Sequence, residues 1–257
     1  MLNFRNTNYL FIGLLIVLAG VQAIYALPFY VFPLVFIVYT LIVFYGSYYV
    51  GSNYFIKVIC SANTVKKEIA ISFDDGPSKN YTPEILEVLK RENIKATFFC
   101  IGNRIPGNGD ILRQINEDGH IVGNHSYSHH FWFDIFSSKK MLEDMKRMDQ
   151  EMEKIIGLKP KLFRPPYGVT NPNLKKAIIN GNYSPIGWTA RSMDTIIKDE
   201  SRLLKRICRS IKPGYVFLFH DTSKTTLSIL PEFIRIVKTM GYNIIPLDKM
   251  LHLKPYA

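Results

Sequence analysis

The first 56 residues contain no acidic side chain, and Arg5 is their one basic residue. All 21 acidic residues and 31 of the 32 basic residues lie beyond position 56, which leaves that part of the chain with a net charge of about +10. A nearly uncharged segment followed by a strongly charged one predicts a membrane segment joined to a soluble domain.

Long apolar runs fill the uncharged segment. Residues 9–27 and 29–50 are almost wholly apolar and are separated by Pro28, and each run is long enough to cross about 30 Å of hydrocarbon. We therefore expect a membrane anchor over residues 1–56, with two transmembrane helices at about 9–27 and 29–50. A linker over 57–66 and a soluble domain over 67–257 would follow. A signal peptide cleaved near Val21-Gln22-Ala23 is the alternative, which the second apolar run disfavours.

Such a hairpin places the N-terminus and the soluble domain on the same side of the membrane. Which side this is must be decided from other observations. The positive-inside rule counts Arg5, Lys57, Lys66 and Lys67 as cytoplasmic. An extracytoplasmic catalytic domain on a multi-pass membrane protein, which is our prediction, therefore rests on function and not on charge.

The sequence lacks the motifs that are typical of several classes of protein. The chain has no G-x-G-x-x-G and no P-loop, so nucleotide-binding folds lose their main support. The three cysteines share no metal-like spacing, and an odd number argues against a disulfide framework. We found no basic helix or zinc-finger pattern, so no nucleic acid is expected, and no protein partner is evident. The basic domain instead favours anionic lipid or acidic polymers.

Beyond residue 57, short apolar runs alternate with amphipathic stretches. Strands are expected near 69–73, 96–101, 120–123, 162–163, 184–188, 215–219 and 243–245, with helices between them at 109–118, 138–156, 172–180, 199–209 and 226–239, and one beginning near Thr82. About seven strand and helix units in alternation predict an α/β fold with parallel strands, either a barrel or a doubly wound sheet.

Two adjacent carboxylates, Asp74 and Asp75, follow the first strand and precede the Gly76-Pro77 turn. The carboxyl end of a strand is where ligands bind in barrels and open α/β sheets. Asp before Gly-Pro is also ordinary turn chemistry, so this pair alone leaves both interpretations open.

Later strands also end in reactive side chains. His125 and His129 are four residues apart, and on a helical turn they would project from one face and could bind one metal ion. Two imidazoles and a carboxylate with open positions are expected of a catalytic metal site. Arg164 follows another strand and could keep an aspartate ionised, while His220 follows a strongly apolar strand.

Four motifs carry a family resemblance. They are Ser72-Phe73-Asp74-Asp75-Gly76, His125-Ser126-Tyr127-Ser128-His129, Arg164-Pro165-Pro166-Tyr167 and Leu218-Phe219-His220. In this order they resemble the S/T-F-D-D-G, H-S/T-x-x-H, R-x-P-Y and L-x-H motifs of polysaccharide deacetylases with NodB homology, carbohydrate esterase family 4. The resemblance covers about residues 66–250. It implies a distorted (β/α)7 barrel after the transmembrane hairpin, which agrees with the seven units.

The resemblance also implies a role for each matching residue. The metal ligands would be Asp75, His125 and His129, with Zn²⁺ as the expected ion and Co²⁺, Mn²⁺ or Ni²⁺ as alternatives. The catalytic set would be Asp74 as base, Arg164 beside it, His220 as general acid, and Asp194 orienting His220. The substrate and the oxyanion would be bound at Pro166, Tyr167, Trp188 and Leu218.

One motif departs from the family pattern. Many members read D-x-x-D-W where this chain reads Arg191-Ser192-Met193-Asp194-Thr195. The later Asp is kept, whereas Arg191 and Thr195 replace the first Asp and the Trp. The missing Trp removes part of the apolar wall for acyl group and sugar, which leaves substrate and acyl-group size open.

These residues predict a metal-dependent hydrolase that removes N-acetyl groups from N-acetylglucosamine-type sugars of a cell-envelope polysaccharide, either peptidoglycan or an extracellular polymer. One alternative is a deacylase or deformylase of a lipid-linked amino sugar at the membrane. The alternative from another class is a catalytically silent, membrane-anchored carbohydrate-binding protein.

Overall fold

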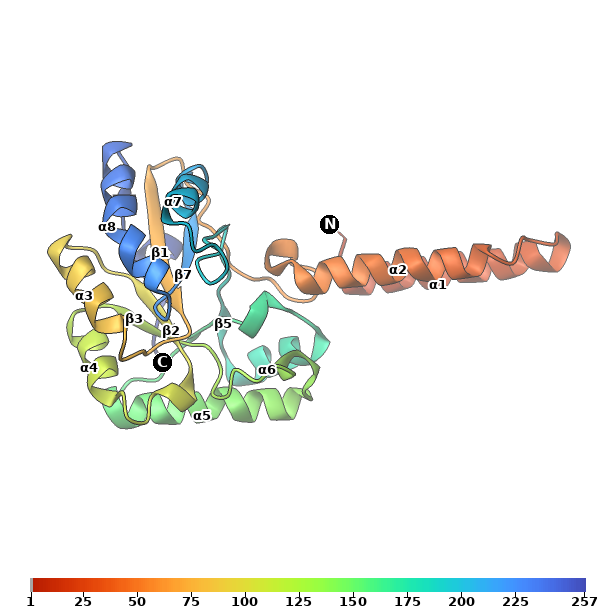
Figure 1. The fold of residues 1–257 in the computed structure, drawn as a ribbon. Helices are drawn as coiled ribbons and strands as arrows, with labels where there is room; N and C mark the ends of the chain where they lie inside the picture. Colours follow the sequence, from red (N-terminus) through yellow and green to blue (C-terminus); the bar gives the residue numbers. More distant parts are fainter. Residues whose placement is uncertain (1) are drawn as a thin grey trace.

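The computed structural model describes residues 2–257 and has two parts, an α/β domain and a helical hairpin that extends away from it (Figure 1). The hairpin consists of α1 (Phe4–Ile24) and α2 (Val31–Tyr48). Helix α1 begins earlier than expected because the side chain of Asn3 accepts a hydrogen bond from the Asn6 N–H and caps it. Both helices are long and apolar enough to cross a membrane, which is compatible with anchoring, although signal sequences share this composition.

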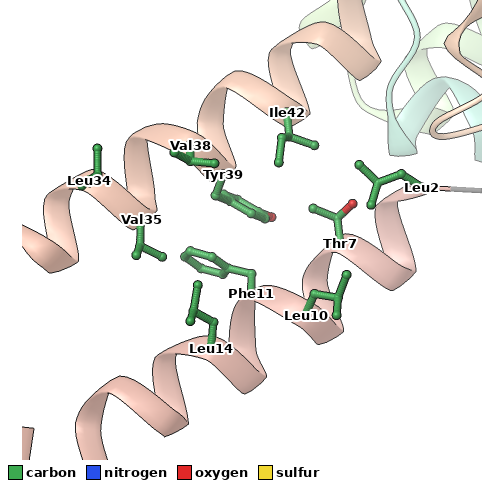
Figure 2. A pocket seen from close by; sticks show the side chains of 10 residues that line it. All are labelled: Leu2, Thr7, Leu10, Phe11, Leu14, Leu34, Val35, Val38, Tyr39 and Ile42. Atoms are coloured by element: carbon green, nitrogen blue, oxygen red, sulfur yellow. The ribbon is translucent and has the colours of Figure 1, made fainter. Parts of the chain in front are cut away.

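The two hairpin helices contact each other through apolar side chains. The ring of Tyr39 stacks on Phe11 with centroids 4.2 Å apart, and its hydroxyl donates to Asn8 Oδ1 at 2.8 Å. Beside this contact lies an apolar gap of about 330 Å³, into which Leu10, Leu14 and Val35 also point (Figure 2). Nearly all other hairpin side chains face outward, as expected of helices surrounded by lipid.

The domain is built on one parallel sheet. Its strands are β1 (Glu68–Asp74), β2 (Thr97–Cys100), β3 (Ile121–Asn124), β4 (Leu162–Phe163), β5 (Ser184–Pro185), β6 (Ala190–Arg191) and β7 (Val216–His220). They follow the order β5-β4-β3-β2-β1-β7-β6, and β8 (Asn243–Ile244) pairs with the start of β1. The edge strands β5 and β6 are joined by only residues 186–189, so the curved sheet nearly returns to its first edge. This confirms the distorted (β/α)7 fold.

Helices surround this sheet (Figure 1). They are α3 (Thr82–Arg91), α4 (Gly109–Glu117), α5 (Ser138–Ile156), α6 (Pro172–Gly181), α7 (Glu200–Cys208), α8 (Lys224–Thr239) and α9 (Leu247–Leu251). The ranges expected from periodicity are met to within two residues for α4 to α8. The methionine stripe of α5 is fully buried at Met141, Met145, Met148 and Met152, as a core stripe should be. Two short elements, β6 and α9, were not predicted.

The segment that joins hairpin and domain packs against the sheet. Ile59 pairs with Ile186 beside β5, and Ser61 pairs with Tyr215 before β7. Val50, Tyr54, Phe55 and Val58 are all buried. Residues 57–66 were predicted to be a linker, and the domain boundaries stay a prediction; in the structure the first half of this segment lies on the domain.

Candidate active site

The carboxyl ends of five strands converge on one cleft of about 160 Å³. Its lining consists of Asp74, Asp75, His125, His129, Pro165, Tyr167, Trp188, Arg191, Thr195, Leu218 and His220. Eight of these are residues that the sequence analysis singled out as site residues. Three more, Arg164, Pro166 and Asp194, are buried and do not line the cleft; Pro165 lines it where Pro166 was expected to.

The turn after β1 brings both adjacent carboxylates to the cleft. Side chains alternate between the two faces of a regular strand, so neighbours would normally point apart. Asp75 has a left-handed φ of +74°, which breaks this alternation. The next residue is Gly76, and there is no room for a side chain at this position. A Cβ here would lie 2.0 Å from Oδ2 of Asp221.

Asp75, His125 and His129 form a cluster that could hold a metal ion, with ligand atoms within 4.8 Å of one another. Oδ1 of Asp75 lies 3.5 Å from Nε2 of each histidine. His125 Nδ1 lies 2.8 Å from the main-chain oxygen of Arg164. Since a carbonyl oxygen can only accept, the proton is on Nδ1 and the Nε2 lone pair faces the cluster. Two nitrogen donors and one carboxylate beside an open cleft fit a divalent ion.

The histidines do not lie on a helical turn, so that part of the prediction is wrong. Residues 125–130 form a loop in which Ser126 and His129 have left-handed φ values of +66° and +43°. Local side chains hold this loop: Asn124 Oδ1 accepts from the Ser126 N–H, and Ser126 Oγ accepts from the His129 N–H. These bonds replace helical ones and still bring the two imidazole rings to 4.9 Å.

Arg164 is fully buried beneath the cleft and ion-paired to Asp74. Its Nη1 donates to Asp74 Oδ1 at 2.6 Å and to Ser72 Oγ at 2.8 Å, while Nη2 donates to the Gly187 carbonyl at 2.9 Å. Burial lowers the pKa of Arg164, and the charge and hydrogen bond of Asp74 oppose this shift. The guanidinium therefore fixes the direction in which Asp74 points.

His220, the last residue of β7, is paired to Asp194 behind the cleft. Its Nδ1 lies 2.7 Å from Asp194 Oδ1, and its main-chain N–H donates to Asp194 Oδ2 at 2.7 Å. Burial alone would lower the pKa of His220, but the hydrogen bond and charge of Asp194 outweigh it and raise the pKa above the ordinary value. Thr226 also donates to Asp194. The imidazolium form of His220 is thus stabilised, with Nε2 directed toward the cleft, 4.0 Å from Asp75.

Tyr167 and Trp188 line the same cleft as His220. Tyr167 has a left-handed φ of +60°, and across residues 2–257 we found no hydrogen bond from its main-chain N–H. Gly168 is in van der Waals contact with Trp188, because a Cβ there would come within 2.5 Å of the indole ring. Leu218, which is buried, also lines the cleft.

Besides Pro165, sequence reasoning assigned no site role to Arg191 and Thr195, which line the cleft, or to Asp221, which is buried beside it. Arg191 lines it, although the sequence showed only that an expected Asp was replaced. Asp221 is fully buried behind Gly76 and accepts a hydrogen bond from Thr82 Oγ1 at 2.6 Å. Its position directly after His220 was the one available signal.

Known proteins with similar sequences and structures indicate the family to which this chain belongs. A family model described as polysaccharide deacetylase matches residues 61–186. A peptidoglycan-N-acetylglucosamine deacetylase of Bacillus cereus is 31% identical over 194 residues, covering 72% of this chain and 68% of that protein. The crystal structure of the Bc1960 peptidoglycan N-acetylglucosamine deacetylase superposes with a TM-score of 0.74 at 27% identity, covering 78% of this chain and 95% of that chain.

A longer relative is the peptidoglycan-N-acetylglucosamine deacetylase of Listeria monocytogenes, 30% identical over 202 residues. The match covers 79% of this chain but only 42% of that protein, so the chain spans less than half of its length. The fold, the order of the motifs and these likenesses agree, and the chain belongs to the polysaccharide deacetylase family, carbohydrate esterase family 4.

Proposed function

We propose that the chain is a metal-dependent hydrolase that removes N-acetyl groups from N-acetylglucosamine-type sugars of a cell-envelope polysaccharide. The observation that carries this proposal is the meeting, in one cleft, of the Asp75, His125 and His129 cluster with the Asp74–Arg164 pair. The names of the relatives, which act on peptidoglycan, support a cell-wall substrate.

Asp75, His125 and His129 would hold the ion, for which Zn²⁺ is our choice because two imidazoles and a carboxylate suit it. Such an ion supplies a coordinated water of lowered pKa and polarises the acyl carbonyl. The protein contributes the orientation of the ligands, since the Arg164 carbonyl fixes the tautomer of His125.

Asp74 acts as the general base. Its Oδ2 lies 3.8 Å from His125 Nε2, which puts it next to the ligand cluster, while Oδ1 is occupied by Arg164. One oxygen is therefore anchored, and the other is available to take a proton from the attacking water. The paired guanidinium holds this carboxylate in one orientation.

His220 acts as the general acid, because Asp194 stabilises its imidazolium form. The water oxygen first bonds to the acyl carbon, and the carbon–nitrogen bond then breaks as Nε2 gives its proton to the departing sugar nitrogen. The products are acetate and a free amine. The Tyr167 N–H, which no main-chain partner occupies, stabilises the negative oxygen between these steps.

The hairpin would anchor this site at the membrane, with the domain on the extracytoplasmic side where a wall polymer lies. A lipid-linked amino sugar is a second candidate substrate, favoured by one contact between anchor and site. Ser47, at the end of α2, donates from Oγ to the Thr170 carbonyl at 2.7 Å, and its own carbonyl accepts from the Thr170 N–H at 3.0 Å. Thr170 lies three residues from Tyr167, so the cleft is close to the end of the hairpin.

Mass spectrometry of cell-envelope sugars, with and without the gene, tests the proposal. We expect the deletion strain to keep one acyl group that the native strain loses, and a His125→Ala copy to leave that phenotype uncorrected. A reporter fused after Ala257 determines the side of the membrane. If pure protein binds metal but releases no acyl group from any N-acyl sugar, the silent carbohydrate-binding alternative is correct instead.

A further inference from the structure

Arg191 lines the cleft but has no partner there. It is half-buried at the end of β6, and its Nε atom is completely buried without a hydrogen bond. Across residues 2–257 we found no hydrogen bond from its guanidinium and no carboxylate within 4.0 Å of it. Burying a charged donor without a partner costs free energy, so such a group in a cleft is poised to bind an anion.

Each carboxylate at the cleft already has a partner. Asp74 is paired to Arg164, Asp75 lies beside His125 and His129, and Asp194 binds His220. None of them is left over for Arg191, whose positive charge therefore faces the substrate without compensation. A divalent ion at Asp75 would increase the positive charge further.

The guanidinium of Arg191 is held in position by its neighbours. β6 pairs with β7, and Arg191 lies in register with Leu218, two residues before His220. The guanidinium carbon is 5.8 Å from the centre of the Trp188 ring, within the range of a cation–π contact. Its donors are thus carried on the sheet and not on a mobile loop, as a specific recognition group requires.

We propose that Arg191 forms a subsite for an anionic substituent, a carboxylate or a phosphate, on the sugar that is deacylated or on its neighbour. A guanidinium binds either group through two parallel N–H···O bonds. This inference rests on the proposed function and adds a substrate class to it: N-acyl amino sugars that carry negative charge near the acyl group. The hydroxyls of a neutral sugar can accept a hydrogen bond from the guanidinium but leave its positive charge without a counter-charge.

The test compares three sets of N-acetylated amino-sugar oligomers that are neutral, carboxylate-bearing or phosphate-bearing. With the full-length protein in detergent we expect a higher kcat/KM for one anionic set than for the neutral set, and the better set identifies the anion. Arg191→Gln should lower the ratio of anionic to neutral kcat/KM at least about tenfold, the loss of one charge-assisted contact. Arg202→Gln on α7 removes an equal charge outside the cleft and should leave this ratio unchanged.

A wild-type ratio near one, or an equal fall of the ratio in both variants, overturns the proposal. Calorimetric binding of a carboxylate-bearing and a phosphate-bearing oligomer to wild type and Arg191→Gln decides the question even if no oligomer is hydrolysed. Acyl release without a preference for charge would refute the subsite alone. Preferential binding of anions without acyl release would refute the proposed hydrolysis and keep the subsite.

Discussion

Arg164 holds Asp74 with its side chain and His125 with its main chain: Nη1 donates to Asp74 Oδ1 at 2.6 Å, and the carbonyl accepts from His125 Nδ1 at 2.8 Å. One buried residue thus orients both the candidate base and a candidate metal ligand. The two tasks use different atoms, so a side-chain substitution can separate them.

Arg164→Lys should lower kcat about 100-fold while the protein keeps its metal. Lysine retains the charge but cannot reach Asp74, Ser72 and the Gly187 carbonyl together, so Asp74 loses its orientation. The carbonyl that positions His125 is unchanged. Steady-state kinetics and metal content by mass spectrometry check both points, and a loss of metal in proportion to activity would contradict the separation.

Substitution of the adjacent carboxylates should separate metal binding from turnover. Asp75→Asn should mainly weaken metal binding, because a neutral amide replaces the charged ligand beside both histidines. Asp74→Asn should leave the metal bound and stop turnover, because the base is lost. Both are measured by metal titration and acetate release. Equal loss of metal in the two variants would show that the assigned roles are wrong.

Asp194→Asn should shift the pH dependence of kcat. Asp194 raises the pKa of His220, so the acid form of His220 persists to higher pH than that of an ordinary imidazole. Without that charge the pKa falls, and the alkaline limb of the profile should move to lower pH, with a loss of about 100-fold in kcat. Thr226→Val removes one hydrogen-bond donor to Asp194 and should shift the alkaline limb by less than Asp194→Asn does. An alkaline limb that stays in place would exclude His220 as the acid.

Asp221→Asn should flatten the dependence of stability on pH. Burial, aided by the charge of Asp75, raises the pKa of Asp221 from 3.8 to about 7 in the folded protein. The folded state holds this proton more tightly, so the stabilisation is full below about pH 4 and is lost as pH rises to about 7. We expect a smaller difference in Tm between pH 5 and pH 8 for the variant.

These melts are measured with a chelator present, so that no ion occupies the nearby cluster. Asp149, whose pKa is raised to about 6 by burial, remains in the variant, so some pH dependence will persist. A variant whose Tm falls between pH 5 and pH 8 as much as the wild type would contradict the assignment.

Truncation tests where the catalytic domain begins. A chain starting at Val50 keeps the buried Val58 and the pairing of Ile59 with Ile186, whereas a chain starting at Lys67 loses both. At about 1.5–3 kcal/mol for each buried aliphatic side chain, the shorter chain should lose several kcal/mol of stability. Chemical denaturation of the two chains measures this, and equal midpoints would support the boundary at residue 67.

The sequence predicted the fold well because the fold follows from periodicity, whereas the roles of the site residues came from the motif resemblance and stay predictions. Apolar runs ending in reactive residues identified the carboxyl ends of β1, β3, β4 and β7, and parallel pairing brings those ends together. No apolar run marks β6, however, because its two residues are Ala190 and Arg191. This strand was therefore missed, and with it the place of Arg191 in the cleft.

Features fixed by single backbone angles or long-range contacts were beyond prediction. The left-handed φ of Asp75 and the irregular loop around His129 depend on local hydrogen bonds that no periodic pattern records. The attachment of Ile59 to the sheet depends on a partner 127 residues later in the chain, Ile186. Composition alone cannot reveal such pairings, which is why residues 57–66 were expected to be a linker.

Two hydrogen bonds join Ser47, at the end of the hairpin, to Thr170, near the cleft. They hold the distance between the hairpin and the cleft nearly constant. If the hairpin lies in a bilayer, as we propose, the cleft would stay at a fixed height above it and would search for substrate in two dimensions. Sugars at that height would meet the cleft at a high local concentration, whereas glycan chains further from the bilayer would not be reached, however abundant they are. The extent to which a glycan is deacylated would then depend on its distance from the membrane.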